Sequence, residues 1–281
     1  MHSISFSRRR LLAAAAAVLA LGGVAAPWPA APAEAQSGTV KLEWLGWSHF
    51  RLTSVNGKVI LINPFITGNA DAALGVDDVT QADLILVADA HRDEIGDSIA
   101  IAQKTGAKVF GPGRVVRWLV ENGLPETQGV GSNQGDRLRW EGITVRNVMS
   151  VHDNSVSKPS TSVFYGGVSS GFVVTFENGW TVYFSGSSAA TSDMELWGSM
   201  YKPDAMIFHM AGPHDPTDVA MSIKLISTGN PNLKTLLPHH HRVTQGANDT
   251  TLDEVTAALS GMGVSIPITN QVRSQVYEFT K

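Results

Sequence analysis

The hydrophobic and polar positions in the first half of the chain predict short strands, followed by alternating helices and strands. The dipeptide Asn56-Gly57 separates two β-rich stretches and favours a tight hairpin turn. Residues 83–87 form an essentially apolar run, which is typical of a strand buried on both faces. The expected strands are 41–45, 50–53, 58–62, 83–87 and 108–110, and the expected helices are 97–104 and 113–122. This half is therefore expected to form β-hairpins followed by a β-α-β arrangement.

The second half of the chain repeats this order of strands and then helices. Asn178-Gly179 favours another hairpin, and Asp215 is a suitable N-cap for a helix that begins at the following proline. The expected strands are 138–140, 144–149, 172–176, 181–184, 205–208 and 236–237, and the expected helices are 192–200, 216–226 and 252–259. Two such halves predict an α/β fold in which two sheets pack face to face with helices outside.

Residues 1–35 have the organisation of an export signal. Three arginines at residues 8–10 precede an apolar run over 11–26, and residues 33–35 form a small-residue cleavage sequence. The sequence SRRRLL at residues 7–12 resembles the twin-arginine signal, which carries folded proteins across a bacterial inner membrane. The alternative is a membrane anchor, but a spanning helix needs about 20 apolar residues, and this shorter run is followed by prolines.

We therefore expect the twin-arginine export machinery to deliver the chain to the periplasm or the medium, with residues 36–281 as one mature domain. Removal of 35 of the 281 residues leaves 246, which is enough for one large domain with a substantial core. The formal charge then changes from −4 to −6, because three arginines and one glutamate are lost. No basic cluster remains, which argues against nucleic acid as a partner. Nothing in this part of the sequence resembles a membrane span.

The chain contains no cysteine. An exported protein of this composition cannot use disulfides, so its stability must come from burial of apolar side chains or from a bound metal. Export in the folded state fits the second possibility, because a cofactor can then be inserted before export.

The densest group of metal-ligand side chains directly follows the buried strand at 83–87. It contains Asp89, His91, Asp93 and Glu94, and a loop at the end of a rigid strand is a common position for a functional site. Another interpretation is an acidic, solvated turn in which Asp93 or Asp97 caps a helix. The segment by itself does not decide between them.

Histidines follow two other expected strands. His152 comes after the strand at 144–149, and three consecutive histidines, residues 239–241, come after the strand at 236–237. Imidazole is the commonest metal ligand in proteins, although a single histidine is more often structural. Ligand-type side chains at three strand ends of one domain predict that they share a site.

The chain resembles the metallo-β-lactamase superfamily, and in particular its broadly distributed metal-dependent hydrolases near the ascorbate-phosphate lactonases. The matching stretches are LGWSHF (45–50), INPFITGN (62–69), ADLILV (82–87), IGD (95–97), YKPD (201–204) and LPHH (237–240). They occur in the family's order through nearly the whole mature chain. The resemblance implies an αββα sandwich of two mixed sheets flanked by helices.

The metal motif departs from that family's pattern, His-x-His-x-Asp-His. Asp89 and Glu94 stand where the family has its first and last histidines, and Ser187 stands at the position of the aspartate that bridges two metals. Asn63 replaces another aspartate of the family. The ligand set implied by the resemblance is Asp89, His91, Asp93, Glu94, His152 and His240. Its carboxylates favour Mn²⁺, Fe²⁺ or Mg²⁺ over Zn²⁺, and the missing bridge favours one metal ion per chain.

The resemblance implies a metal-dependent hydrolase in which a metal-bound water attacks an ester, lactone or phosphodiester of a small-molecule substrate. Asp93 is the candidate base or water-orienting residue. His214 lies in the sequence GPHD at 212–215, where it would hold substrate or act as an acid, or would simply be a loop histidine beside a helix cap. The alternative function is a non-catalytic binding protein that keeps the fold with a degenerate metal site.

Overall fold

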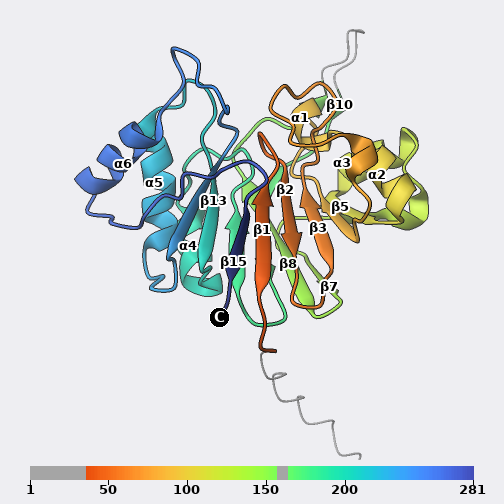
Figure 1. Ribbon diagram of the computed structural model, residues 1–281, viewed down its shortest axis with the longest axis horizontal. Coiled ribbons are helices and arrows are strands. Elements are labelled where there is room, and N and C mark those ends of the chain that lie inside the picture. The colour runs from red at the N-terminus through yellow and green to blue at the C-terminus, as the bar shows by residue number, and fades with distance from the viewer. Residues whose placement is uncertain (1–35, 157–163) are drawn as a thin grey trace, which may run out of the picture. The chain divides into compact units, whose positions relative to one another are not determined.

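The computed structural model describes residues 36–156 and 164–281, and these include a seven-stranded mixed sheet (Figure 1). Its order is β15-β1-β2-β3-β4-β5-β6. The strands are β1 Val40–Trp44, β2 Phe50–Thr53, β3 Val59–Ile62, β4 Leu84–Leu86, β5 Lys108–Pro112, β6 Gly129–Ser132 and β15 Val276–Phe279. Strands β15, β1, β2 and β3 pair antiparallel, and β3, β4, β5 and β6 pair parallel. The carboxyl ends of β3, β4 and β5 therefore meet at one edge of the sheet.

A second mixed sheet has six strands in the order β14-β13-β12-β11-β8-β7. The strands are β7 Arg137–Trp140, β8 Ile143–Ser150, β11 Ser169–Thr175, β12 Thr181–Phe184, β13 Ala205–His209 and β14 Thr235–His239. Strands β12, β13 and β14 pair parallel, whereas β7, β8, β11 and β12 pair antiparallel. A short antiparallel pair, β9 Ser155–Val156 and β10 Phe164–Tyr165, stands apart from both sheets.

Helices cover the outer face of each sheet, which confirms the expected αββα sandwich. Short helix α1, with α2 and α3, accompanies the first sheet, and α4, α5 and α6 accompany the second (Figure 1). The helices are α1 Arg92–Ile95, α2 Ser98–Thr105, α3 Gly113–Glu121, α4 Asp193–Tyr201, α5 Pro216–Ser227 and α6 Leu252–Gly261, with 3-10 turns at Val76–Asp78 and Glu126–Gln128. In the described residues, no helix has the length and apolar character needed to cross a membrane.

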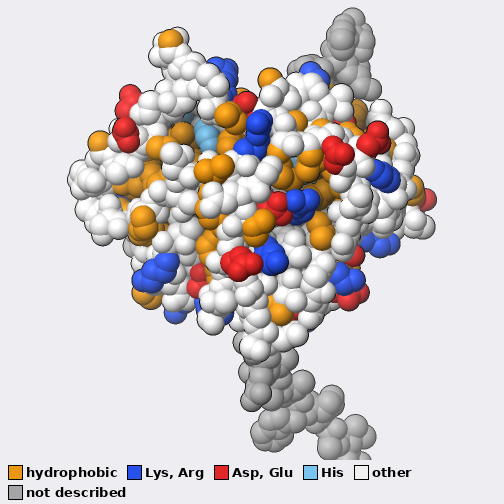
Figure 2. Space-filling model, viewed as in Figure 1, with side chains coloured by type: hydrophobic (Ala, Val, Ile, Leu, Met, Phe, Trp, Pro, Cys, Tyr) orange, Lys and Arg blue, Asp and Glu red, His pale blue; other side chains and the backbone are white. Residues whose placement is uncertain are grey.

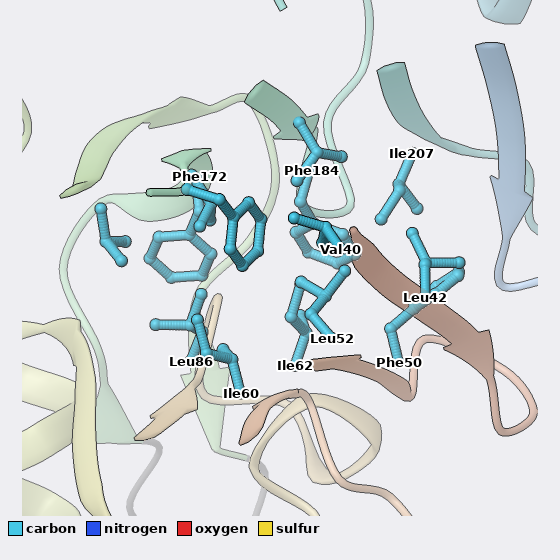
Figure 3. Close-up of a cluster of buried hydrophobic side chains, with 14 of the residues drawn as sticks. Val40, Leu42, Phe50, Leu52, Ile60, Ile62, Leu86, Phe172, Phe184 and Ile207 are labelled. Carbon is cyan, nitrogen blue, oxygen red and sulfur yellow. The ribbon is translucent and has the colours of Figure 1, made fainter. Parts of the chain in front are cut away.

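The inner faces of the two sheets form the central hydrophobic core, where side chains of β1 to β4 face those of β11 to β13 (Figure 3). Phe184 lies between Phe50 of the first sheet and Phe172, with centroid separations of 6.5 Å to each ring. Complete burial of one such side chain contributes roughly 1.5–3 kcal/mol relative to exposure. This core, together with the two outer layers, supplies stability that a chain without cysteine cannot obtain from disulfides.

Two sheet strands were not expected from the sequence, β6 and β15. Strand β15 pairs only with β1 and alternates exposed and half-buried positions, so it lacks the apolar run of an interior strand. Strand β6 contains two glycines, which have low strand propensity. The export signal expected at residues 1–35 lies outside the described residues.

His49 is a buried titratable group of the core. Its side chain is 1% exposed, and neither ring nitrogen has a hydrogen-bond partner within the described parts of the chain. Burial, together with the charge of Arg51, lowers the pKa of His49 to about 3. The folded protein therefore keeps this ring neutral at pH values where the unfolded chain protonates it.

Replacement of this ring should make the protein less sensitive to acid. Below the unfolded-state pKa of about 6.5, only the unfolded chain binds the proton, so the free energy of unfolding should fall as pH decreases. We expect His49→Leu to remove up to about 1.4 kcal/mol of this loss per pH unit between pH 6 and 4. Urea denaturation of both proteins at several pH values measures the difference, and parallel pH profiles would contradict the assignment.

Candidate metal centre

The loop after β4 is held in place by three distant segments. Asn63, which follows β3, accepts a hydrogen bond from the backbone N–H of Ala88 (3.0 Å). Asn154, which precedes β9, accepts one from the N–H of Ala90 (2.8 Å). The N–H of Ser170 in β11 donates to the carbonyl of Ala88 (2.9 Å). Both sheets therefore fix the backbone that carries the acidic cluster.

Asp89 lies at the centre of this loop and has no exposed surface. Its Oδ1 accepts a hydrogen bond from the N–H of His91 (2.9 Å), which stabilises the tight turn before α1. Its Oδ2 is buried and has no partner among the described residues. A buried carboxylate with an unpaired oxygen is strongly unfavourable unless a cation compensates it.

Asp89, His91 and His152 form one cluster of donor atoms. One ligand atom from each lies within 4.8 Å of the others, and His91 Nδ1 is 3.1 Å from Asp89 Oδ1. The rings of His91 and His152 are 5.0 Å apart and nearly perpendicular. A carboxylate and two imidazoles that converge in this way, with a carboxylate oxygen left unpaired, fit a divalent metal ion.

The local charges differ between the two histidines. The Asp89 carboxylate raises the pKa of His91 to about 9, chiefly because it accepts a hydrogen bond from the ring. Burial lowers the pKa of His152 and so favours its neutral form, which is the form that binds metals. The negative field that retains a proton on His91 would equally attract a metal cation, and the two compete for the same position.

Glu94, Asp93 and His240 form a second group beside the first. His240 Nε2 lies 3.2 Å from Glu94 Oε1 and 3.6 Å from Asp93 Oδ2. The hydroxyl of Ser187 donates to Glu94 Oε1 at 2.7 Å. Burial alone would lower the pKa of His240, but its hydrogen bonds to Asp93 and Glu94 raise it to about 9. Within the chain, Ser187 and His240 thus engage Glu94 Oε1, whereas Glu94 Oε2 is buried and has no hydrogen-bond partner among the described residues.

Trp47 forms a wall next to the second group. Its Nε1–H donates to Asp93 Oδ2 (2.8 Å), and its carbonyl accepts from Trp44 Nε1 (2.8 Å) and from the N–H of His240 (3.2 Å). Trp47 and His240 adopt positive φ angles of 56° and 62°, which are uncommon for residues other than glycine. Surrounding contacts must therefore hold both residues in these conformations.

The three consecutive histidines point in different directions. His240 faces Asp93 and Glu94, whereas His239 is buried against Phe184, with a ring separation of 4.6 Å. His241 stacks on Trp44 at 4.2 Å and lies away from the acidic groups. On the face shown in Figure 2, histidine reaches the surface in only one small area, surrounded by hydrophobic and cationic side chains.

A cavity of about 350 Å³ joins the two groups. Its lining includes five of the six ligand candidates, all except Asp89, which lies behind His91 with no exposed surface. His214 also lines the cavity, and its ring packs edge-on to that of His209 at 4.4 Å. Burial lowers the pKa values of both rings. The structure thus brings all the candidates from the sequence into one region, divided into two groups.

The helix-capping interpretation of the acidic cluster is wrong. Helix α1 has His91 at its N-cap, without a capping side-chain hydrogen bond, and Asp93 bonds to Trp47 instead. Asp97 occupies the N-cap position of α2, but its side chain makes no capping hydrogen bond, and its Oδ2 instead accepts from the backbone N–H groups of Ile66 and Thr67.

Three lining residues with polar side-chain groups were not proposed from the sequence as site residues: Trp47, His209 and Arg242. His209 is the last residue of strand β13. A search for histidines at strand ends, which selected His152 and His240, would therefore also have found it. Trp47 and Arg242 lie in loops and carry no such signal, since only the folded chain places them at the cavity.

Comparison with known proteins supports this description. Residues 58–252 match the family described as "Beta-lactamase superfamily domain". A UPF0173 metal-dependent hydrolase of Myxococcus xanthus is 31% identical over 277 residues, covering 92% of this chain and 96% of that protein. A second, from Cupriavidus taiwanensis, is 30% identical over 260 residues, covering 86% and 89%.

Solved structures show the same fold. Igni18, a metallo hydrolase from Ignicoccus hospitalis, aligns with a TM-score of 0.71 at 24% identity, covering 86% of this chain and 99% of that one. An isothiocyanate hydrolase from Delia radicum gut bacteria aligns with a TM-score of 0.63 at 15% identity, covering 85% and 99%. At these identities the likeness concerns the fold, whereas the sequence relatives define the family. The chain belongs to the metallo-β-lactamase superfamily, among the UPF0173 metal-dependent hydrolases.

Proposed function

We propose that this protein hydrolyses an ester, lactone or phosphodiester of a small molecule with one divalent metal ion held by Asp89, His91 and His152. The observation that carries the proposal is the convergence of these three donors around a buried, unpaired carboxylate oxygen next to a cavity. A divalent ion at this position polarises the scissile group and lowers the pKa of a water molecule.

Asp93 is proposed to orient the attacking water. Its Oδ2 is fixed by the indole N–H of Trp47 at 2.8 Å, and Asp93 lines the cavity two residues after the ligand His91. A carboxylate positioned in this way accepts a hydrogen bond from water and selects the direction in which its lone pair points. The neighbouring His240 compensates the charge of Asp93 across 3.6 Å.

His214 is proposed to contact the substrate, because it lines the same cavity as the candidate metal ligands. It is half-buried, lies in the loop before α5, and its ring packs on His209. A neutral imidazole has one N–H donor and one acceptor, which suits a substrate oxygen or the leaving group. This role makes His214 a candidate catalytic residue together with Asp93.

We propose one metal ion per chain because His240 compensates the acidic charge of the second group from within the chain. Glu94 Oε1 accepts from Ser187 and lies 3.2 Å from His240 Nε2, so a second cation at this oxygen would have to displace partners that are built into the fold. A carboxylate ligand beside two imidazoles favours Mn²⁺, Fe²⁺ or Mg²⁺ more than a histidine-only site would.

Export by the twin-arginine route to the periplasm or the medium remains part of the proposal. It is supported by SRRRLL at residues 7–12, by the apolar run over 11–26 and by the small-residue sequence at 33–35. A folded protein exported by this route would carry a metal ion acquired in the cytoplasm.

Loss of a ligand should abolish metal retention. We expect His91→Ala and His152→Ala each to weaken metal binding at least about tenfold, since each removes one of three donors. His241→Ala is the matched control, because that ring stacks on Trp44 outside the cavity and its loss should leave the metal in place. Metal content after dialysis measures the effect, and full retention in both ligand variants would refute the ligand assignment.

The hydroxyl of Ser187 should stabilise the fold through Glu94. Ser187→Ala leaves a nearly buried carboxylate with one donor fewer, and we expect the free energy of unfolding to fall by about 1–3 kcal/mol. Ser199→Ala, at an exposed position of α4, is the control and should change stability by less than about 0.5 kcal/mol. Equal stability of the two variants in urea would contradict the proposed pairing.

The function itself is tested by elemental analysis and activity together. Protein purified from its native compartment, without chelators or a histidine tag, should contain about one equivalent of Mn or Fe per chain. It should hydrolyse at least one of a set of aryl esters, lactones and phosphodiesters. Asp93→Asn should lower kcat about 100-fold with the metal retained, whereas Asp77→Asn, at an exposed position, should not. Absence of both metal and hydrolysis would favour a non-catalytic binding protein.

A further inference from the structure

Arg242 is a cationic residue that lines the metal-centre cavity and two neighbouring cavities. Among the described residues, it is the one lysine or arginine that lines this cavity of about 350 Å³. It also lines an adjoining cavity of about 450 Å³ and a third of about 870 Å³. The β14–α6 loop that carries Arg242 and the β3–β4 loop lie at the same end of the sandwich (Figure 1). A substrate that extends from the metal centre into either neighbouring cavity would therefore contact the Arg242 guanidinium.

The guanidinium is held by its own loop. Asp249 accepts from Arg242 Nη1 with both carboxylate oxygens (3.2 and 3.3 Å), and it also accepts from the N–H of Gly246 (2.8 Å). A Cβ at Gly246 would lie 2.7 Å from Arg242 Nη1, so glycine leaves room for the side chain there. The Arg242 side chain remains 51% exposed. Its orientation is thus fixed while its outer part stays accessible.

Two nitrogens of Arg242 remain available for a ligand. Asp249 bonds only to Nη1, and across residues 36–156 and 164–281 neither Nε nor Nη2 has a hydrogen-bond partner. A guanidinium has five N–H donors in a planar fork that matches the two oxygens of a carboxylate or phosphate. The exposed pair with Asp249 stabilises little by itself, but it orients this fork.

The adjoining cavity indicates where the rest of such a ligand would lie. Trp47 and Arg242 line both it and the metal-centre cavity, so they form the boundary between the two. Beyond Trp47 the lining includes Phe65 and the Gly68–Asp71 segment of the β3–β4 loop. Asp71 is the acidic residue of that lining, and its Oδ2 accepts from the N–H of Val243. An anion would therefore be favoured at the boundary, beside Arg242, and disfavoured deeper in, near Asp71.

We propose that Arg242 is a specificity-determining residue that selects substrates with a carboxylate or phosphate group close to the scissile bond. This inference rests on the proposed hydrolase function and narrows its substrate class. The anion is bound through Arg242 Nε and Nη2, and an uncharged arm lies against Trp47 and Phe65 in the adjoining cavity. The metal centre then acts on a bond whose position the oxyanion has fixed.

A pair of esters that differ only in charge tests the proposal. The probes are 3-acetoxybenzoate and 3-acetoxybenzamide, which have nearly the same size. Water adds to the acetyl carbon, the bond to the phenol oxygen breaks, and acetate and the phenol are released; one proton of the water passes to the phenol oxygen and the other to the solvent. Metal-loaded wild type, Arg242→Gln and Arg117→Gln are compared. Arg117 is exposed on α3, outside the three cavities that Arg242 lines.

We expect Arg242→Gln to lower kcat/KM for the benzoate about tenfold or more, while the benzamide changes by less than about twofold. Arg117→Gln should change neither. Calorimetric titration with the products provides a readout independent of catalysis. Wild type should bind 3-hydroxybenzoate more tightly than 3-hydroxybenzamide, and Arg242→Gln should remove most of that difference.

The outcomes separate this inference from the proposed function. If neither ester is hydrolysed but benzoate binding depends on Arg242, ester hydrolysis fails and the oxyanion site stands. If both esters are hydrolysed and Arg242→Gln affects them equally, the inference fails and the hydrolase stands. Benzoate binding that is tight but unaffected by Arg242→Gln would mean that the metal itself takes the carboxylate. That result, or no preference of the wild type for the benzoate, overturns the proposal.

Discussion

The buried carboxylate of Asp89 is the constraint around which this end of the molecule is organised. It has no exposed surface, and one of its oxygens has no partner within the described residues. An uncompensated charge in such a place would be strongly destabilising, so the fold must supply a cation or a proton nearby. The loop that carries it is fixed from both sheets, by Asn63 and Asn154 and by the backbone of Ser170. Rigid support of this kind keeps a ligand set at the geometry that a metal requires.

The carboxylates of Asp89 and Glu94 are both buried, and different side chains lie close enough to compensate their charges. Glu94 is nearly as buried as Asp89; Ser187 and His240 engage its Oε1, and its Oε2, like Asp89 Oδ2, has no partner among the described residues. What distinguishes Asp89 is that donor atoms of His91 and His152 lie within 4.8 Å of its carboxylate and of each other. Two of the residues that depart from the family's motif, Ser187 and Glu94, are hydrogen-bonded to each other, whereas a third, Asp89, belongs to the cluster that could hold a metal ion.

The cavity beside these groups combines strand ends with loops. The strand ends supply groups of fixed geometry, such as His209 and the donor cluster, and the loops supply Trp47, His214 and Arg242. When loops supply part of a cavity wall, their residues can vary between related proteins without disturbing the groups at the strand ends. Such a fold can therefore accept different substrates. Trp47 and His240, which both have positive φ angles, line this cavity and are joined by a backbone hydrogen bond. Such strain is maintained only where the surrounding structure defines the conformation closely.

The sequence by itself determined the two-sheet architecture and the strand ends that carry the site, because strand and helix periodicities are local properties of the chain. Its hydrophobic pattern also identified the buried strand β4, and its family resemblance selected His240 from three consecutive histidines. Only the tertiary structure decided how the six ligand candidates divide into two groups, because that depends on contacts between remote residues. Ser187 and Glu94 lie 93 positions apart, and no local pattern reports their hydrogen bond. The same applies to the edge strand β15 and to Arg242, since their environments are created by packing between distant segments rather than by neighbours in sequence.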